Sequence, residues 1–236
     1  MPLGRVSTKT VLVGWRTEGA RSRAGHPSLV ECMSQFLRFD FGWDGVVRVQ
    51  RGQVYLRHPR PADYAAWSQL RAESREFLQP WEPLWTEDEL SREAWRRRLR
   101  RYGQDVRDGT GAPFLIFRQD DDTLVGGINL NNITRGVAQM CSVGYWVGAR
   151  HARQGYARTA LQAVVEYGLE TLALHRIEAN CLPHNAPSRT LLETSGFAFE
   201  GLSRAYLRIN GHWEDHLRFA FTAGDPMPWR AYGRLA

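Results

Sequence analysis

The stretch from Gly155 to Ser188 constrains the fold of this chain more than any other segment. It reads GYARTALQAVVEYGLETLALHRIEANCLPHNAPS. A glycine turn comes first, followed by a helix, a short strand and an Asn-x-x-Ser helix start. The helix is amphipathic, because apolar residues recur at i, i+3, i+4, i+7, i+8 and i+11 from Leu161. This alternation of helix and strand predicts an α/β (α+β) domain.

The turn before this helix has the chemistry of an anion-binding site. Small residues at Gly155 and Ala157 let backbone N–H groups approach an anion, and the helix start adds free donors. Arg150, Arg153 and Arg158 add positive charge. Such a turn can hold phosphates while two diverging strands hold an amide-rich arm, and acetyl-coenzyme A has both parts. For this short segment in isolation, an ordinary loop is the alternative.

Further motifs follow one another along the chain in a fixed order. They are GGINLNN from Gly126, RG from Arg135, VGYWV from Val143, QGYA from Gln154, HRIEAN from His175, PHNAPS from Pro183, SGF from Ser195, EG from Glu200 and NGHWEDH from Asn210. In this set the chain resembles the GCN5-related N-acetyltransferases (GNAT), and among them the bacterial ribosomal-protein alanine N-acetyltransferases. The order and spacing match over about residues 53–222.

The resemblance implies a GNAT fold, with a central mixed, mostly antiparallel twisted sheet of about seven strands, about four flanking helices and splayed central strands. It assigns residues 51–223 to the acetyltransferase domain, 1–50 to an N-terminal extension and 224–236 to an irregular tail. One hypothesis is that translation starts at Met33, so that the residues before it are never made. The intact mass of the natively expressed protein tests this, since a species beginning at Met1 contradicts it.

Local patterns place the elements within that domain. Strands are predicted at Val54–His58, Pro113–Arg118, Leu124–Asn131, Ala138–Val147 and Arg176–Cys181, and a hairpin joins Phe199–Ile209 to Trp213–Phe221 across Asn210-Gly211. Helices are predicted over Asp63–Phe77, over Glu87–Asp108 and from Gly155, and Asn185 caps a further short helix.

The resemblance also implies which residues bind acetyl-CoA. The strand residues Tyr145, Trp146 and Val147 splay from Ile177–Asn180, and their free backbone groups receive the pantetheine arm and polarise the carbonyl. Core packing is the alternative for the side chains of Trp146 and Val147. The resemblance implies that the turn binds the phosphates, and that Asn185 lies near the pantetheine and Ser188 near the sulfur. The turn residues are Arg150, Arg153, Gln154, Gly155, Tyr156, Ala157 and Arg158.

The turn departs from the family pattern at two positions. Ala152 stands where the family has Arg or Gln, and Arg153 stands where it often has Gly. A residue with a Cβ limits positive φ angles, so the detailed phosphate contacts are put in question.

The reaction implied is direct attack of an amine on the thioester in a ternary complex. The departing thiolate needs a proton, and Ser188 is the candidate donor, with Tyr206 as a second. The alternative is that Asn185 only caps a helix and Ser188 is a first-turn residue. For the base, Leu207 stands where some relatives have glutamate. This leaves Glu178 and Glu82, whose alternatives are a salt bridge and a solvated loop position.

The acceptor site is expected between the first helices and the terminal hairpin, and core packing is the alternative for each residue of its wall. An N-terminal amine has a pKa near 8, so a strong base is not required. The expected acceptor is the α-amine of a ribosomal or similar protein beginning with Ala or Ser. A small amine such as a polyamine or aminoglycoside, and a ribosome-assembly or RNA-binding role without turnover, are the other hypotheses. The wall residues are Phe77, Trp81, Trp85 and Tyr206.

Arginine supplies almost all of the positive charge, since Lys9 is the only lysine. In the second helix, Trp95, Leu99 and Tyr102 fall on one face with Val106 and leave most arginines on the solvated side. A solvated face is one interpretation, and a docking surface for ribosomal RNA or an acidic partner is the other. The arginines concerned are Arg96, Arg97, Arg98, Arg100 and Arg101.

The remaining features favour a cytoplasmic enzyme without metal. Cys32, Cys141 and Cys181 are odd in number and lack Cys-x-x-Cys spacing, which suits a reducing compartment. No apolar run approaches the roughly 20 residues of a membrane span. His212 and His216 would lie about 13 Å apart on a strand, too far to share one ion.

Overall fold

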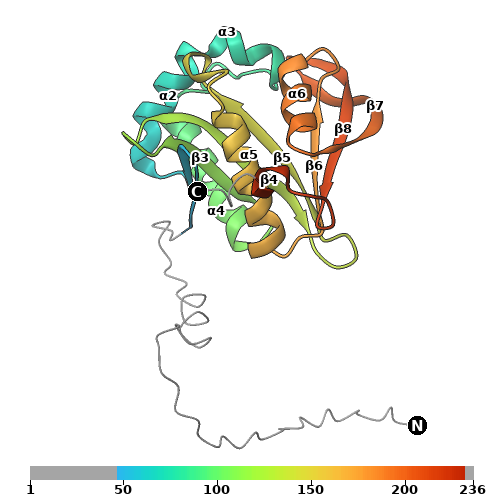
Figure 1. The fold of residues 1–236 in the computed structure, drawn as a ribbon. Helices are drawn as coiled ribbons and strands as arrows, with labels where there is room; N and C mark the ends of the chain where they lie inside the picture. Colours follow the sequence, from blue (N-terminus) through green and yellow to red (C-terminus); the bar gives the residue numbers. More distant parts are fainter. Residues whose placement is uncertain (1–46, 232–236) are drawn as a thin grey trace, which may run out of the picture. The chain divides into compact units, whose positions relative to one another are not determined.

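Residues 47–231, which this computed structural model describes, are organised around one eight-stranded sheet (Figure 1). The strand order is β1-β2-β3-β4-β5-β6-β8-β7, and all neighbours are antiparallel except β5 and β6. This confirms the mixed, mostly antiparallel GNAT sheet. The strands are β1 (Arg48–Arg51), β2 (Val54–Arg57), β3 (Ala112–Arg118), β4 (Leu124–Thr134), β5 (Met140–Val147), β6 (Arg176–Cys181), β7 (Ala198–Ile209) and β8 (His212–Thr222).

The strand that the sequence does not predict is β1, at one edge of the sheet. Arg48 pairs with Arg57 and Arg51 with Val54, so β1 and β2 form a tight hairpin. A four-residue strand is too short for its alternation to stand out from a loop. The hypothesis of a start at Met33 concerns residues outside the described range.

Helices cover both faces of the sheet. Their bounds are η1 (Pro61–Asp63), α2 (Tyr64–Glu73), α3 (Arg75–Leu78), η2 (Gln79–Trp81), α4 (Arg92–Arg107), η3 (Ala149–His151), α5 (Tyr156–Glu166), the π turn η4 (Tyr167–Thr171), α6 (Ala186–Thr194) and α7 (Pro228–Ala231). Among the helices of residues 47–231, none is long and apolar enough to cross a membrane.

The helices differ from the sequence prediction at three places. The first one breaks at Ser74, whose backbone leaves the helical region. The arginine helix begins at Arg92 instead of Glu87, because the Ser91 hydroxyl accepts a hydrogen bond from the Ala94 N–H at 3.0 Å and caps it. In the segment expected to be irregular, α7 forms one turn and buries Trp229.

Two apolar layers separate the helices from the sheet. On one face, α5 and α6 pack on alternate strand residues and bury Leu161, Val164 and Leu192 completely. On the other face, α2 and α4 place Trp67 and Trp95 in tilted contact, with ring centroids 4.7 Å apart. The amphipathic stripe predicted for α5 is therefore buried. The stripe predicted for α4 is buried at Trp95 and Tyr102, but Val106 is 40% exposed.

The parallel pair β5 and β6 separates along its length. Its register runs from Met140 opposite Arg176 to Val143 opposite Ala179 and then stops. Beyond Val143, β5 continues against β4 alone, and the last residues of β6 pair only with β8. This confirms the splayed central strands and leaves backbone groups of β5 without a strand partner on the β6 side.

Gly126 lets β4 and β5 approach closely beside this opening. A Cβ at this position would lie 2.2 Å from the Trp146 carbonyl oxygen, which is backbone and cannot move aside alone. Gly144, on β5, has only the Asn131 amide nitrogen within reach, at 3.7 Å.

We expect Gly126→Ala to lower the free energy of unfolding by about 3 kcal/mol, because the strands must separate to admit a methyl group. Gly144→Ala is the matched control and should change it by less than about 0.5 kcal/mol. Urea unfolding followed by circular dichroism measures both. Equal effects of the two substitutions would contradict the close approach.

Candidate active site

Two helix starts flank the open end of β5 and β6. Gly155, the N-cap of α5, has φ 83°, and Arg153 has φ 60°. The first N–H groups of an α-helix have no partner within it, so the start of α5 presents free donors. Arg153 therefore adopts the left-handed conformation despite its Cβ, and the departure from the family's glycine does not prevent the turn from forming.

Neighbouring elements fix this turn. The Gln53 amide at the start of β2 donates to the Gln154 carbonyl at 2.9 Å, and the Gln154 amide donates to the Arg150 carbonyl at 2.8 Å. A Cβ on Gly155 would meet the Gln53 amide nitrogen at 3.3 Å. The loop is thus held from both sides before any ligand binds.

The three arginines near the turn differ in their partners. Arg150 forms an ion pair with Glu73 at 3.0 Å, and Arg158 donates to the Thr194 hydroxyl of α6 at 3.1 Å. Arg153 is exposed and has no ion pair among the described residues. Of the three, Arg153 is the one whose guanidinium needs no rearrangement to meet a phosphate.

Several of the predicted cofactor residues have side chains that serve packing. Tyr156 is buried against His151, with ring centroids 6.1 Å apart. Trp146 packs with the apolar layer beneath α2. The alternative role of the Trp146 side chain, which is core packing, is therefore confirmed. The backbones of both residues remain at the turn and at the open edge of β5. Ala157 follows Tyr156 in the first turn of α5, where a small side chain leaves the N–H groups accessible.

A pair of hydroxyls spans the opening. The Tyr145 hydroxyl on β5 and the Ser188 hydroxyl on α6 lie 2.8 Å apart, in a hydrogen bond whose donor can be either. Asn185 caps α6 by accepting from the Ser188 N–H at 3.1 Å, which orients that first turn. Burial raises the pKa of Tyr145 and of the nearby Cys181, so both stay protonated at neutral pH.

The second candidate donor lies apart from this pair. Tyr206 sits at a register shift of β7 and packs edge-on against the buried His216 at 5.8 Å. Among the described residues no hydrogen bond joins Tyr206 to Ser188 or Tyr145. Asp215 accepts from the Ala205 N–H at 2.8 Å and so stabilises the irregular part of β7.

Glu178 is held between two arginines on β6 and β8. Its Oε1 atom accepts from Arg176 at 2.9 Å and from Arg218 at 3.1 Å. Glu178 pairs with Ser142, one step before the last β5–β6 pair. The salt bridge, which is the alternative role of Glu178, is therefore present. The Oε2 atom of Glu178 is not used in these contacts.

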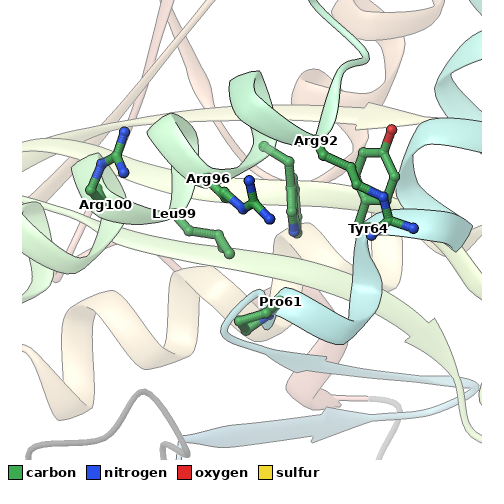
Figure 2. A pocket seen from close by; sticks show the side chains of 7 residues that line it. Pro61, Tyr64, Arg92, Arg96, Leu99 and Arg100 are labelled. Atoms are coloured by element: carbon green, nitrogen blue, oxygen red, sulfur yellow. The ribbon is translucent and has the colours of Figure 1, made fainter.

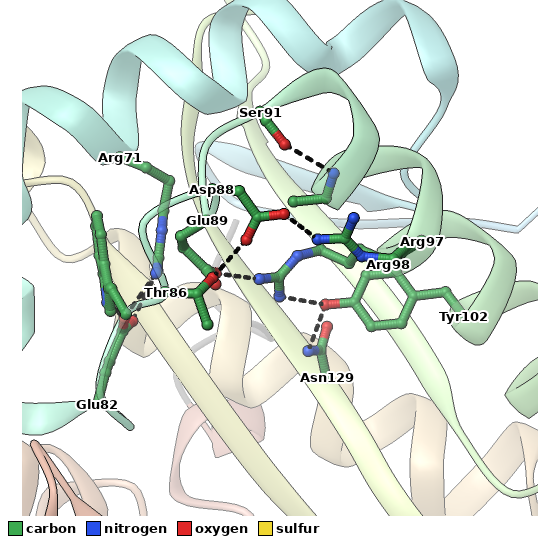
Figure 3. A network of polar contacts seen from close by, with 12 residues as sticks. Arg71, Glu82, Thr86, Asp88, Glu89, Ser91, Arg97, Arg98, Tyr102 and Asn129 are labelled. Atoms are coloured by element: carbon green, nitrogen blue, oxygen red, sulfur yellow. Dashed lines mark hydrogen bonds and ion pairs between the residues drawn. The ribbon is translucent and has the colours of Figure 1, made fainter.

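Glu82 is the centre of a more crowded network (Figure 3). Arg71, which is only 6% exposed, donates to both of its carboxylate oxygens at 2.7 and 2.6 Å. Trp85 donates its indole N–H to Oε2 at 2.9 Å, and the Arg71 guanidinium lies over the rings of Trp85 and Trp146. Glu82 is thus a structural anchor and not the solvated loop residue considered as its alternative.

The same loop bridges the two halves of the site. The Glu82 carbonyl accepts from the Asn210 N–H of the β7–β8 turn at 2.9 Å. Trp81 packs against His184, just before α6, with ring centroids 5.5 Å apart. Phe77 is 45% exposed and Tyr206 41%, so these two expected wall residues offer open apolar surface. Trp85 is buried instead, as its core-packing alternative requires.

Two residues of this site are absent from the sequence prediction. Arg71 falls on the same helical face as Trp67, Leu70 and Ser74, and an arginine within an apolar face could have signalled a buried ion pair. His184 is recognisable only through its neighbour Trp81, which is distant in sequence.

The arrangement has the components of acyl transfer. Free backbone groups along β5 can polarise a carbonyl, and the Tyr145–Ser188 pair can supply a proton to a leaving group. The α5 start and Arg153 provide an anion site at one end. An exposed aromatic rim lies on the side of the loop at Glu82.

Comparison with known proteins agrees with this geometry. The family model for an acetyltransferase (GNAT) domain matches residues 53–198. The [ribosomal protein uS5]-alanine N-acetyltransferase of Escherichia coli K12 is 34% identical over 184 residues, which cover 78% of this chain and 95% of that protein. The probable N-acetyltransferase YjcK of Bacillus subtilis is 34% identical over 172 residues, covering 73% and 95%.

A solved structure shows the same fold. RimJ of Mycobacterium smegmatis, in complex with CoA-disulfide, superposes with a TM-score of 0.70 at 35% identity, over 75% of this chain and 86% of that one. The family match spans more than half of the chain and includes the turn, the splayed strands and the start of α6. The chain belongs to the GNAT family of acetyltransferases.

Proposed function

We propose that this protein transfers the acetyl group of acetyl-CoA to the N-terminal α-amine of a ribosomal or similar protein that begins with Ala or Ser. The observation that carries the proposal is the Tyr145–Ser188 hydroxyl pair at the end where β5 leaves β6. The E. coli relative is a [ribosomal protein uS5]-alanine N-acetyltransferase, and the mycobacterial relative is in complex with CoA-disulfide, which supports this proposal.

The residues of the opening fit CoA without rearrangement of the backbone. The start of α5 and the exposed Arg153 face the pyrophosphate, because free N–H groups and a cation both stabilise its charge. The amide-rich arm runs along β5 past Val143, where the strand lacks its neighbour. Asn185 and Ser188 then lie at the sulfur end. Acetyl-CoA, when bound there, supplies the acetyl group as a thioester.

Transfer forms a C–N bond and breaks a C–S bond. The neutral amine attacks the acetyl carbonyl, whose oxygen gains charge and is stabilised by backbone N–H groups of β5. Ser188 donates its proton to the departing sulfur and regains one from solvent, while its 2.8 Å contact with the Tyr145 hydroxyl orients it. The burial that raises the Tyr145 pKa keeps this hydroxyl protonated at neutral pH, so it contacts Ser188 as a neutral group.

The amine loses its own proton to solvent or to a carboxylate. Glu178 has an oxygen not engaged by Arg176 or Arg218, whereas both oxygens of Glu82 are occupied by three donors. Of the two candidates, Glu178 is therefore the better acceptor, through water. Glu82 instead holds the loop that carries Trp81 toward His184.

We expect acetylation of peptides with a free Ala or Ser terminus, and none of the same peptides with blocked termini and an internal lysine. Intact mass after incubation with acetyl-CoA measures the gain of one acetyl group. Peptides starting with Thr or Met and spermidine complete the panel. Labelling of spermidine or lysine alone would reject N-terminal transfer in favour of small-amine or side-chain acetylation.

Removing the hydroxyl in Ser188→Ala should lower kcat about 100-fold, because the thiolate then leaves without a positioned proton donor. The Kd for CoA should stay within about threefold, since the helix cap by Asn185 uses the backbone N–H of residue 188. Ser188→Thr keeps a hydroxyl and should recover much of the rate. Steady-state kinetics and calorimetry test this, and a kcat for Ser188→Ala within threefold of wild type would exclude Ser188 as the donor.

Neutralising the anchor in Glu82→Gln should lower the free energy of unfolding by about 3 kcal/mol, because Arg71 stays buried without its anion. The KM for peptide should rise while the pH profile of kcat keeps its shape. Glu178→Gln is the comparison, and it should alter that pH profile with less effect on stability. If the pH profile flattens in Glu82→Gln alone, Glu82 is the base and the assignment above is wrong.

A further inference from the structure

A groove lies between α4 and the segment that joins η1 to the first turn of α2. It consists of two adjoining hollows of about 340 and 460 Å³, which share Pro61, Leu99 and Arg100 as lining residues. Figure 2 shows the residues that line the first hollow. The groove lies at the first turn of α2. The loop that carries Trp81 and Glu82 follows the last turn of α2 in the chain. The ten residues of α2 separate the two sites by about 15 Å.

Arginines at regular spacing line this groove. Arg92, Arg96 and Arg100 follow one another at i+4, and Gln104 and Arg107 extend the row. Positions four apart stand on the same side of a helix. The row from residue 92 to 107 is about 22 Å long at 1.5 Å per residue.

The three arginines at i+4 spacing have no acidic partner among the described residues. No ion pair of residues 47–231 involves Arg92, Arg96 or Arg100. The neighbouring Arg97 and Arg98 turn instead toward Asp88 and Glu89 and are paired there (Figure 3). Of the predicted cluster, Arg97 and Arg98 are paired and Arg96 and Arg100 line the groove, while Arg101 has no ion pair among the described residues and lines neither hollow.

The bottom of the groove also carries an unused donor. Trp95 lines the first hollow and is 2% exposed, and its buried indole nitrogen has no hydrogen-bond partner among the described residues. Tyr64 adds an aromatic ring, with the Arg92 guanidinium 4.5 Å above it.

We propose that this groove is a docking surface for the phosphodiester backbone of single-stranded RNA. A row of about 22 Å can meet several phosphates, because a nucleic-acid strand carries one negative charge at every nucleotide. A single acidic side chain would satisfy one guanidinium only. The Arg92 guanidinium, which lies over the Tyr64 ring, also offers a planar surface on which a base can stack, which an acidic peptide would not use.

This inference goes beyond the proposed function and does not depend on it, because no residue of the groove belongs to the transfer site. It also changes the expected set of RNA-contacting arginines: Arg96 and Arg100 are retained and Arg92 is added. The residues removed from the set are Arg97, Arg98 and Arg101.

The test compares two double variants of equal charge. The double variant Arg96→Gln with Arg100→Gln removes two positive charges from the groove. The double variant Arg97→Gln with Arg101→Gln removes two positive charges from elsewhere on α4. The probe is a fluorescein-labelled single-stranded RNA of about 12 nucleotides, followed by anisotropy from 50 to 200 mM salt. Losing two phosphate contacts should weaken binding about 20-fold at 0.1 M salt and reduce the salt slope by about 1.4.

Each outcome decides the proposal. A selective loss in the groove variant supports it. Equal losses in both variants would assign binding to net charge, and no loss in either would leave the groove without this role; both overturn it. Displacement of the RNA by oligoglutamate of equal charge at equal concentration would reassign the groove to an acidic protein. Peptide acetylation should stay within twofold of wild type in both variants, so failure here and failure of the proposed transfer reaction are separable.

Discussion

The end of pairing between β5 and β6 is the constraint on which the rest of the site depends. Two parallel strands that stayed paired would satisfy each other's backbone groups and leave nothing to bind an extended ligand. Pairing stops after Val143 and Ala179, while β4 and β8 continue to support the two strands from outside. The sheet can therefore open in its middle without losing its edges, and the starts of α5 and α6 flank the opening.

Polar contacts in this protein serve two distinct purposes. Around Glu82 they are saturated, because Arg71 and Trp85 together occupy both carboxylate oxygens and fix the loop near the β7–β8 turn. Near the opening they are left incomplete, as with Arg153 and the first N–H groups of α5. Saturated networks give rigidity, whereas incomplete ones give binding capacity. The helix α4 repeats this division, with Arg98 paired inward and Arg96 open to the groove.

The sequence predicted the elements whose signals are local. The apolar stripe from Leu161, the cap at Asn185 and the Asn210-Gly211 turn each involve neighbours within a few residues, and each is found in the structure. Colinear motifs also predicted the family and the splayed strands. Prediction failed for β1, whose pairing depends on β2, and for the start of α4, where several polar residues compete to be the cap.

The sequence by itself determined the fold class and the position of the glycine turn before α5, and it predicted the Ser188 hydroxyl as a candidate proton donor. Only the tertiary structure decided which partners these residues have. It placed Tyr145 against Ser188, 43 residues apart in the chain, and removed Glu82 from the solvent by pairing it with Arg71. Helical and strand periodicity report which face of an element is buried, but they carry no information about which distant side chain meets it. Contacts between charged groups depend on that missing information, so the roles of the glutamates and arginines were the part that sequence alone left open.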